Sequence, residues 1–382
     1  MGVRPHYLPE LIVWLLCLGA ICFLYRWARE EHGLRRQGAI GILALSVVWI
    51  TAGLAFSIYR IVALFPEPLT AWVRGLSIGV AICLLWAFWV LLIIRLFRSR
   101  KPPVFSPQRR DLMRAATILA VGAPVAVTTF AIIKRNNLSL KEFTIALPDL
   151  HPDLNGLKLV QISDIHLSPF VPEAVLARAI DMANETRAHI GLITGDLISR
   201  SRDPLDACFR QLKRLRVDSE MLGCLGNHEV YSQTEDYTTE QGARQGISFL
   251  RMQARMLRFG GARLNFAGVD YQPRNQPYLE GAEDLIVPGV TNILLSHNPD
   301  VFPVAGRQGY DLTIAGHTHG GQINVEILHN NMSPVRFLTP YVYGLYREGR
   351  SSVFVTRGIG TVGIPARFGA PPEVALIRLC AT

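Results

Sequence analysis

The sequence has few cysteines, and those few form neither a pair nor a cluster. The 382 residues include six cysteines and no Cys-x-x-Cys spacing. This scatter excludes a disulfide framework and a thiolate zinc site, and it is typical of cysteines that serve as small buried hydrophobic residues. Internal repeats and low-complexity segments are absent as well. A chain of this length is expected to form two or three ordinary domains.

The C-terminal two thirds of the chain lack an excess of positive charge, although the whole protein carries a net charge of +9. Residues 1–135 contain 16 of the 39 Lys and Arg residues but only 5 of the 30 acidic residues, so their net charge is +11 and that of the remainder is −2. All six tryptophans also lie in the first 135 residues. A slightly acidic remainder without a basic and aromatic stripe has no electrostatic footprint for nucleic acid, so no nucleic-acid partner is expected.

Long apolar runs are confined to the same N-terminal third. Four of them are uncharged over 15, 23, 20 and 19 residues, at positions 11–25, 37–59, 75–94 and 115–133. A helix needs about 20 apolar residues to cross a bilayer, and Arg26 and Trp27 can extend the short first run to the interface. We therefore predict a membrane domain with four transmembrane helices over residues 1–135 and a second domain over residues 136–382.

Lys and Arg are concentrated in two of the loops that flank these runs. The segments 26–36 and 95–114 together hold 11 basic residues, which the positive-inside rule places in the cytoplasm. Both termini, and with them the C-terminal domain, are then expected outside the cytoplasm, with a cytoplasmic domain as the alternative. Ser106-Pro-Gln-Arg-Arg-Asp-Leu-Met113 resembles a twin-arginine export signal; the other interpretation is a pair of cytoplasmic anchoring arginines.

From about residue 142, short apolar strands alternate with amphipathic helices. Strands are predicted at 143–147, 157–165, 190–194, 221–225, 264–269, 292–296, 312–315, 353–357 and 374–379. Helices are predicted at 174–185 and 205–215, and the segment 239–258 is predicted to be mostly helical. This alternation is typical of a layered α/β domain with a mostly parallel or mixed sheet, in which functional residues lie at the carboxyl ends of strands.

Potential metal ligands lie at the ends of five of these strands. They are Asp164, His166, Asp196, Asn227, His297, His317 and His319. Alternation along an extended chain would place Asp164 and His166 on one side of the backbone. Each short motif alone is more often a turn or a cap, but all five in this order form a strong signal. Nitrogen and oxygen ligands without a thiolate suit Mn²⁺, Zn²⁺ or Fe, and seven ligands are too many for one ion. Two ions bridged by Asp196 account for all seven.

The order Asp-x-His, Gly-Asp, Gly-Asn-His-Glu, His and Gly-His-x-His resembles the calcineurin-like metallophosphoesterase superfamily over roughly residues 140–382. Segments 316–322 and 358–373 resemble its membrane-attached bacterial branch, which includes exported phosphoesterases and enzymes acting on UDP-diacylglucosamine-type lipids. The resemblance implies a four-layer αββα sandwich after the membrane helices, a bacterial inner-membrane location, and metal-dependent hydrolysis of a phosphate ester or pyrophosphate. A lipid-linked substrate is expected from the membrane tether.

The resemblance also assigns the ligands to two ions. The first ion would be held by Asp164, His166, Asp196 and His319. The second would be held by Asp196, Asn227, His297 and His317. His228 would bind neither ion but would lie over the leaving group as a proton donor, unless it only hydrogen-bonds behind the ligands. Two such cations activate a water and clamp the attacking and leaving oxygens of an in-line displacement.

Three nearby features have two interpretations each. Glu229 either supports the ligands or is a solvated turn residue. Arg367 either meets a substrate phosphate or lies on the surface. The apolar loop 167–171 either contacts an acyl chain or packs against the domain. Two other functions are also considered, a non-catalytic binding module and a nuclease of the same superfamily. Intact ligand positions argue against the first and the net charge of −2 against the second.

Overall fold

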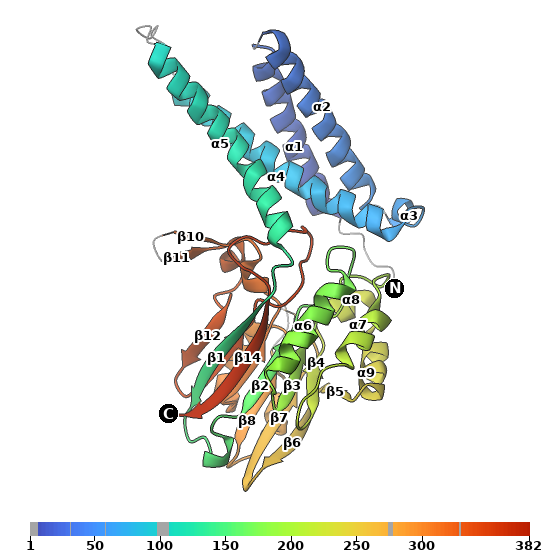
Figure 1. Ribbon diagram of the computed structural model, residues 1–382, viewed down its shortest axis with the longest axis vertical. Helices are drawn as coiled ribbons and strands as arrows, with labels where there is room; N and C mark the ends of the chain where they lie inside the picture. The colour runs from blue at the N-terminus through green and yellow to red at the C-terminus, as the bar shows by residue number, and fades with distance from the viewer. Residues whose placement is uncertain (1–6, 31, 58, 98–106, 274–277, 328–329) are drawn as a thin grey trace. The chain divides into compact units, whose positions relative to one another are not determined.

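The computed structural model describes the chain except for residues 1–6, 31, 58, 98–106, 274–277 and 328–329 (Figure 1). The chain divides into two compact units, one of Met1–Ile133 with Gly363–Pro365 and one of Lys134–Val362 with Ala366–Thr382. All seven predicted ligands belong to the second unit.

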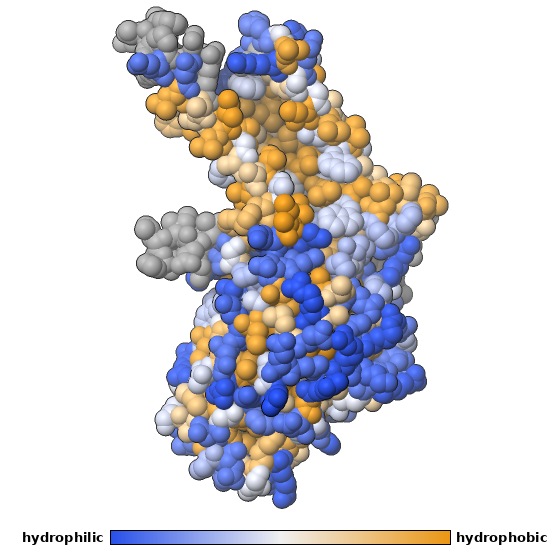
Figure 2. Space-filling view, viewed as in Figure 1, coloured by the Kyte–Doolittle hydropathy of each residue, from blue (hydrophilic) through white to orange (hydrophobic). Residues whose placement is uncertain are grey.

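Long apolar helices make up most of the described N-terminal unit. They are α1 Tyr7–Ala28, α2 Gly33–Ala55, α4 Glu67–Phe97 and α5 Pro107–Lys134, with the single turn α3 Tyr59–Val62 between α2 and α4. Each of the four long helices has the length and composition to cross a membrane. Hydrophobic residues cover most of their visible surface (Figure 2). The twin-arginine-like segment begins at Ser106, outside the described residues, and its backbone from Pro107 onward forms the start of α5.

Two six-stranded sheets form the centre of the C-terminal unit. Their strand orders are β1-β14-β2-β3-β4-β5 and β12-β13-β9-β8-β7-β6. Strands β2 to β5 pair in parallel in the first sheet, and β7, β8, β9 and β13 pair in parallel in the second. The strands are β1 Ser139–Leu147, β2 Lys158–Ile162, β3 Ile190–Thr194, β4 Met221–Cys224, β5 Ile247–Phe249, β6 Gln253–Phe259, β7 Ala262–Gly268, β8 Thr291–Leu295, β9 Leu312–Ala315, β12 Gly344–Glu348, β13 Ser351–Val355 and β14 Glu373–Ala381, with a separate hairpin of β10 Val325–Ile327 and β11 Asn330–Met332.

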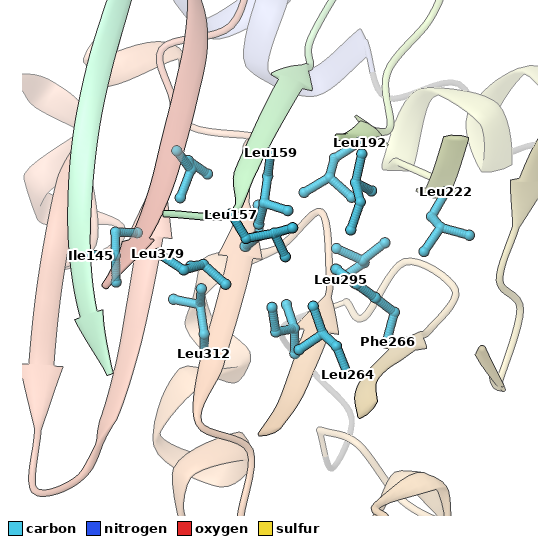
Figure 3. Close-up of a cluster of buried hydrophobic side chains, with 14 of the residues drawn as sticks. Ile145, Leu157, Leu159, Leu192, Leu222, Leu264, Phe266, Leu295, Leu312 and Leu379 are labelled. Atoms are coloured by element: carbon cyan, nitrogen blue, oxygen red, sulfur yellow. The ribbon is translucent and has the colours of Figure 1, made fainter. Parts of the chain in front are cut away.

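The two sheets enclose one apolar core. Leu192 and Leu222 of the first sheet pack in the same cluster as Leu264 and Phe266 of the second (Figure 3). Helices contact both sheets: α6 Glu173–Glu185 contacts β14, α9 Glu235–Arg244 contacts β5, and α10 Phe302–Gln308 contacts β9 and β13. Helix α7 Leu205–Leu212 packs on α6. The domain is therefore the αββα sandwich that the sequence predicted.

The prediction of a mostly helical segment at 239–258 is wrong. Helix α9 ends at Arg244, and strands β5 and β6 occupy the rest of the segment. Gly246, at φ +78°, takes the left-handed conformation that commonly ends a helix. Strand β6 is an edge strand with mostly exposed side chains, so it lacks the apolar alternation by which strands are recognised.

Candidate metal centre

The predicted ligands lie in tight turns at the ends of the strands. Strand β2 ends at Ile162, three residues earlier than predicted, so Asp164 and His166 do not belong to an extended strand. Their φ angles are +49° and +47°, in the left-handed region. The expectation that strand alternation places both side chains on one side is therefore wrong. Their orientation depends instead on the left-handed backbone conformation of the two residues, which costs about 1–3 kcal/mol for each. The same strained conformation recurs at Asp196, His317 and His319.

One group of ligand atoms lies around the carboxylate of Asp164. The groups of Asp164, His166 and His319 each offer an atom within 4.8 Å of the others, and all three side chains are buried. His319 Nε2 lies 3.5 Å from Asp164 Oδ1 and 3.1 Å from His166 Nε2. Ligands about 2.1 Å from one tetrahedral ion lie roughly 3.4 Å apart, so this spacing fits a first cation.

A second group lies around Asp196. Asp196, His297 and His317 also offer atoms within 4.8 Å of one another. His297 Nε2 lies 3.0 Å from Asp196 Oδ2. Its other ring nitrogen, Nδ1, donates to the carbonyl of Thr194 at 2.7 Å, an arrangement that turns Nε2 toward the site.

Asp196 lies between the two groups. Its Oδ2 is 3.0 Å from His297 Nε2 and 3.5 Å from His166 Nε2, so a single oxygen approaches ligands of both sets. Its Oδ1 accepts a hydrogen bond of 2.9 Å from the backbone N–H of His228. The carboxylate is thereby oriented with Oδ2 toward both groups, as a bridging ligand requires.

One further buried polar atom also fits a cation. Asn227 is 5% exposed, and its Oδ1 has no hydrogen-bond partner. Buried polar atoms are almost always satisfied, so an unsatisfied one in the residue next to His228 needs an explanation. Ligation of a divalent ion supplies one. Asn227 begins helix α8 Asn227–Ser232, directly after β4 and Gly226.

The charges of the site are strongly coupled. Burial raises the pKa of Asp164 to about 6. Burial also acts to raise the pKa of Asp196, but the charge and hydrogen bond of His297, together with the charges of His228 and His166, hold it well below its usual range. The carboxylate of Asp196, acting against burial, raises the pKa of His297 to about 10. Burial lowers the pKa of His166 to about 3 and that of His319 well below its usual range. These two imidazoles are therefore neutral, the form that binds metal ions, whereas His297 is protonated and would release that proton on binding a cation.

His228 lies at the edge of the site. Its Nδ1 donates to the carbonyl of Ser199 at 2.8 Å, which leaves Nε2 as the ring nitrogen available to a substrate. Its ring packs edge-on against that of His166, with centroids 4.7 Å apart. His228 also comes within ligand distance of His166 and Asp196, so the distances alone do not exclude it as a ligand.

Glu229 supports the ligand loops and is not a solvated turn residue. It is fully buried, and its two oxygens accept hydrogen bonds from three backbone N–H groups, those of Asp196, Leu197 and Gly226. These bonds tie the loop after β3 to the loop after β4. Burial and the charge of Asp196 raise the pKa of Glu229, which the three hydrogen bonds oppose.

Arg367 is neither a surface residue nor free to meet a phosphate. It is 2% exposed, and its guanidinium donates to the carbonyls of Gly360, Ala370 and Arg357 at 2.9–3.0 Å. Its Nη2 also lies 3.3 Å from His319 Nδ1. Arg367 therefore holds the loop of residues 357–370 against His319, a predicted ligand. The apolar loop 167–171 packs inward, since Leu167, Phe170 and Val171 are all buried.

Two tyrosines and a serine at the site were not predicted. Tyr271 lies beside the rings of His297 and His317, with centroids 6.4 and 5.7 Å away, and Tyr231 lies 5.6 Å from that of His228. Ser199 contacts His166 and His228. Tyr271 follows the predicted strand 264–269, so the strand-end rule could have identified it. No comparable sequence signal marks Ser199 or Tyr231.

Two groups of nitrogen and oxygen atoms that could hold metal ions share the carboxylate of Asp196 at the strand ends of an αββα sandwich, an arrangement that fits the class of metal-dependent phosphoesterases. Residues 157–321 match the family model of calcineurin-like phosphoesterases. The chain thus contains a calcineurin-like metallophosphoesterase domain, the domain of a hydrolase that uses divalent metal ions.

Similar proteins occur in bacteria and animals. An uncharacterized metallophosphoesterase of Bacillus subtilis, YkuE, is 28% identical over 63% of this chain and 85% of its own length. The phosphodiesterase YaeI of Escherichia coli is 28% identical over 58% of this chain and 82% of its own. A transmembrane protein with metallophosphoesterase domain from Danio rerio is 29% identical over 74% of this chain and 65% of its own. Together with the four apolar helices, the last relative indicates that this chain associates with a membrane.

Proposed function

We propose that the protein is a membrane-anchored phosphoesterase that hydrolyses a phosphate ester or pyrophosphate of a lipid-linked substrate with two divalent cations. The observation that carries this proposal is the position of Asp196 Oδ2 between the two ligand groups. When bound, a pair of divalent cations supplies an activated water and neutralises charge on the phosphoryl oxygens. Asp164, His166, Asp196 and His319 would hold the first cation. Asp196, Asn227, His297 and His317 would hold the second. Their nitrogen and oxygen donors suit Mn²⁺, Zn²⁺ or Fe.

His228 is proposed to protonate the leaving group. Because its Nδ1 hydrogen is engaged by the Ser199 carbonyl, a proton on Nε2 is the one that can be transferred. The backbone N–H of the same residue holds Asp196. His228 thereby couples the position of the proton donor to that of the bridging carboxylate.

Replacing His228 with alanine is expected to separate acid catalysis from metal binding. Hydrolysis of a diester with a poor leaving group, such as an alkoxide, should slow by about 10²–10⁴-fold, because general acid catalysis contributes that much. A nitrophenyl ester, which leaves without a proton, should lose far less. The measurement is kcat for both esters together with the metal content of the variant. His151→Ala, at an exposed histidine outside the site, is the control. Equal losses for both esters, or loss of metal, would contradict the assignment.

Two other functions are less well supported. A non-catalytic binding module would not need all seven ligand positions, and each of them carries a metal-binding side chain. A nuclease would be expected to surround its site with basic residues, whereas residues 136–382 carry a net charge of −2. Hydrolysis of a small or lipid-linked phosphate therefore remains the better candidate.

The proposed location is a bacterial inner membrane, with the phosphoesterase domain outside the cytoplasm. The four apolar helices support anchoring, and the 11 basic residues of segments 26–36 and 95–114 support the orientation. An anchored domain stays close to a lipid-linked phosphate, which is the reason for proposing such a substrate.

A cleavable tag fused after Thr382 tests the orientation. In intact spheroplasts, added protease is expected to remove the tag, because an even number of spans with cytoplasmic loops at 26–36 and 95–114 leaves the C-terminus outside. A tag that is protected until the spheroplasts are lysed would instead place the domain in the cytoplasm. A cytoplasmic protein carrying the same tag controls for leakage.

A further inference from the structure

An exposed apolar turn follows β11 in the C-terminal unit. Phe337, at the end of the 3-10 turn Pro334–Phe337, is 95% exposed, and the next residue, Leu338, is 60% exposed. Arg336 beside them is exposed as well. Among the described residues of this unit, no other large hydrophobic side chain is as exposed as Phe337. Such a pair of adjacent apolar residues is the kind of feature that marks a contact site.

The turn is well held at both ends. Ser333 and Thr339, which flank it, are buried. Ser333 Oγ accepts from the N–H of Val335 at 3.3 Å, and the N–H of Leu338 donates to the carbonyl of Val335 at 2.8 Å. Thr339 Oγ1 donates to the carboxylate of Asp300. Phe337 and Leu338 are therefore presented by a folded turn.

Hydrogen bonds connect the segment that carries this turn to the metal centre. Thr318, which lies between the two histidines of the last ligand motif, donates through Oγ1 to the carbonyl of Val342 at 2.6 Å. Ser333 Oγ approaches the carbonyl of Gly321 at 3.4 Å. The segment that presents Phe337 is therefore hydrogen-bonded to the loop that bears His317 and His319.

The chemistry of the turn fits a bilayer surface better than a protein partner. One phenylalanine and one leucine offer on the order of 300 Å² of apolar surface, against about 800 Å² per partner in a stable protein interface. An aromatic and an aliphatic residue next to an arginine are instead typical of segments that insert into the lipid interface. Only four residues separate α5 from β1, a span of at most about 14 Å. A domain tied so closely to an apolar helix stays near the membrane that this helix enters.

We propose that the turn of residues 334–338 inserts Phe337 and Leu338 into the interfacial region of the bilayer, with Arg336 at the level of the lipid phosphates. This inference rests on the proposed membrane anchoring, but not on the identity of the substrate. Contact through this turn would hold the metal centre at the membrane surface, where the phosphate of a lipid-linked substrate lies.

Nitroxide accessibility in the full chain tests the proposal. Cys22, Cys83 and Cys380 are replaced by alanine, which leaves only the buried Cys17, Cys208 and Cys224. A nitroxide is then attached to Phe337→Cys, or to Arg263→Cys at the exposed start of β7 as the matched control. A third sample keeps Cys83 of α4 as a reporter of helix insertion. All three are reconstituted in nanodiscs of phosphatidylcholine and phosphatidylglycerol, and relaxation by oxygen and by a water-soluble nickel complex is compared.

The ratio of relaxation by oxygen to relaxation by nickel is expected to be several-fold higher for the label at position 337 than for the label at 263. The label at 83 is expected to show a similarly high ratio. If positions 337 and 263 behave alike while 83 is lipid-exposed, the turn does not insert although the anchoring stands. If position 83 is also exposed to nickel, the anchoring itself fails and the inference with it. Poor access of both reagents at 337 would indicate a protein partner and would equally overturn the proposal. An unchanged melting temperature verifies that Phe337→Cys folds.

Discussion

Replacing Asp196 with asparagine is expected to abolish hydrolysis while leaving the sandwich folded. The amide oxygen can still accept the hydrogen bond from the N–H of His228, which places the amide NH₂ where Oδ2 now lies near His166 and His297. An NH₂ group cannot ligate a cation, so both ligand groups lose their common oxygen. We expect kcat/KM for a chromogenic phosphodiester to fall by about 10³-fold or more, since the loss of even one preorganised electrostatic contact to a transition state costs 10²–10³-fold.

The metal content of the Asp196→Asn variant is the second readout. Two ions per chain in the unmodified protein should become fewer than one, measured by elemental analysis of the purified full chain. Asp218→Asn, at an exposed carboxylate in the connection between β3 and β4, is the matched control and should keep both ions and full activity. A variant at position 196 that retained two ions and normal rates would disprove the bridging role.

The strands that carry the ligands could be predicted because they are buried on both faces. Strands β3 and β9 have the predicted bounds, and all their side chains are buried. Such strands form continuous apolar runs that end abruptly at polar residues. Edge strands such as β6 and β12 contact the core on one side at most, and their exposed charged residues resemble those of a loop or a helix. The layer architecture was therefore predictable, as was the apolar part of the edge strand β1, while the edge strands β5, β6 and β12 were not.

The sequence predicted which residues lie together at one edge of the sheets, but not the contacts that support them. Motif order identifies residues that share one edge of a sheet, since parallel strands align their carboxyl ends. It contains no information on the three backbone N–H groups that donate to Glu229, or on the carbonyl groups that hold Arg367. Those contacts depend on how loops from different strands fold over one another. The left-handed conformation of Asp164 and His166 is likewise a tertiary effect, because neither residue type requires it.

Replacing Gly195 with alanine is expected to destabilise the domain more than any ordinary glycine replacement. Gly195 has φ +80°, and a Cβ there would lie 2.5 Å from the backbone nitrogen of Gly226 and 2.8 Å from His297 Nδ1. The left-handed conformation costs alanine about 1–2 kcal/mol. The contact with Gly226 adds to this, because it cannot be relieved without moving the loop that carries Asn227. We expect a total loss of about 3–5 kcal/mol in the free energy of unfolding, the range of the severest single substitutions.

Gly289→Ala separates the two contributions. Gly289 has a similar φ of +74°, but a Cβ at this position would meet no heavy atom within 4 Å, so only the conformational cost applies. With a shift of about 2–4 °C per kcal/mol for a domain of this size, the melting temperature should fall by roughly 10 °C for Gly195→Ala and by about 3–4 °C for Gly289→Ala. Metal content should fall in the first variant alone, since only Gly195 touches the loops of Asn227 and His297. Equal melting temperatures for the two variants would mean that the close approach of these loops does not constrain position 195.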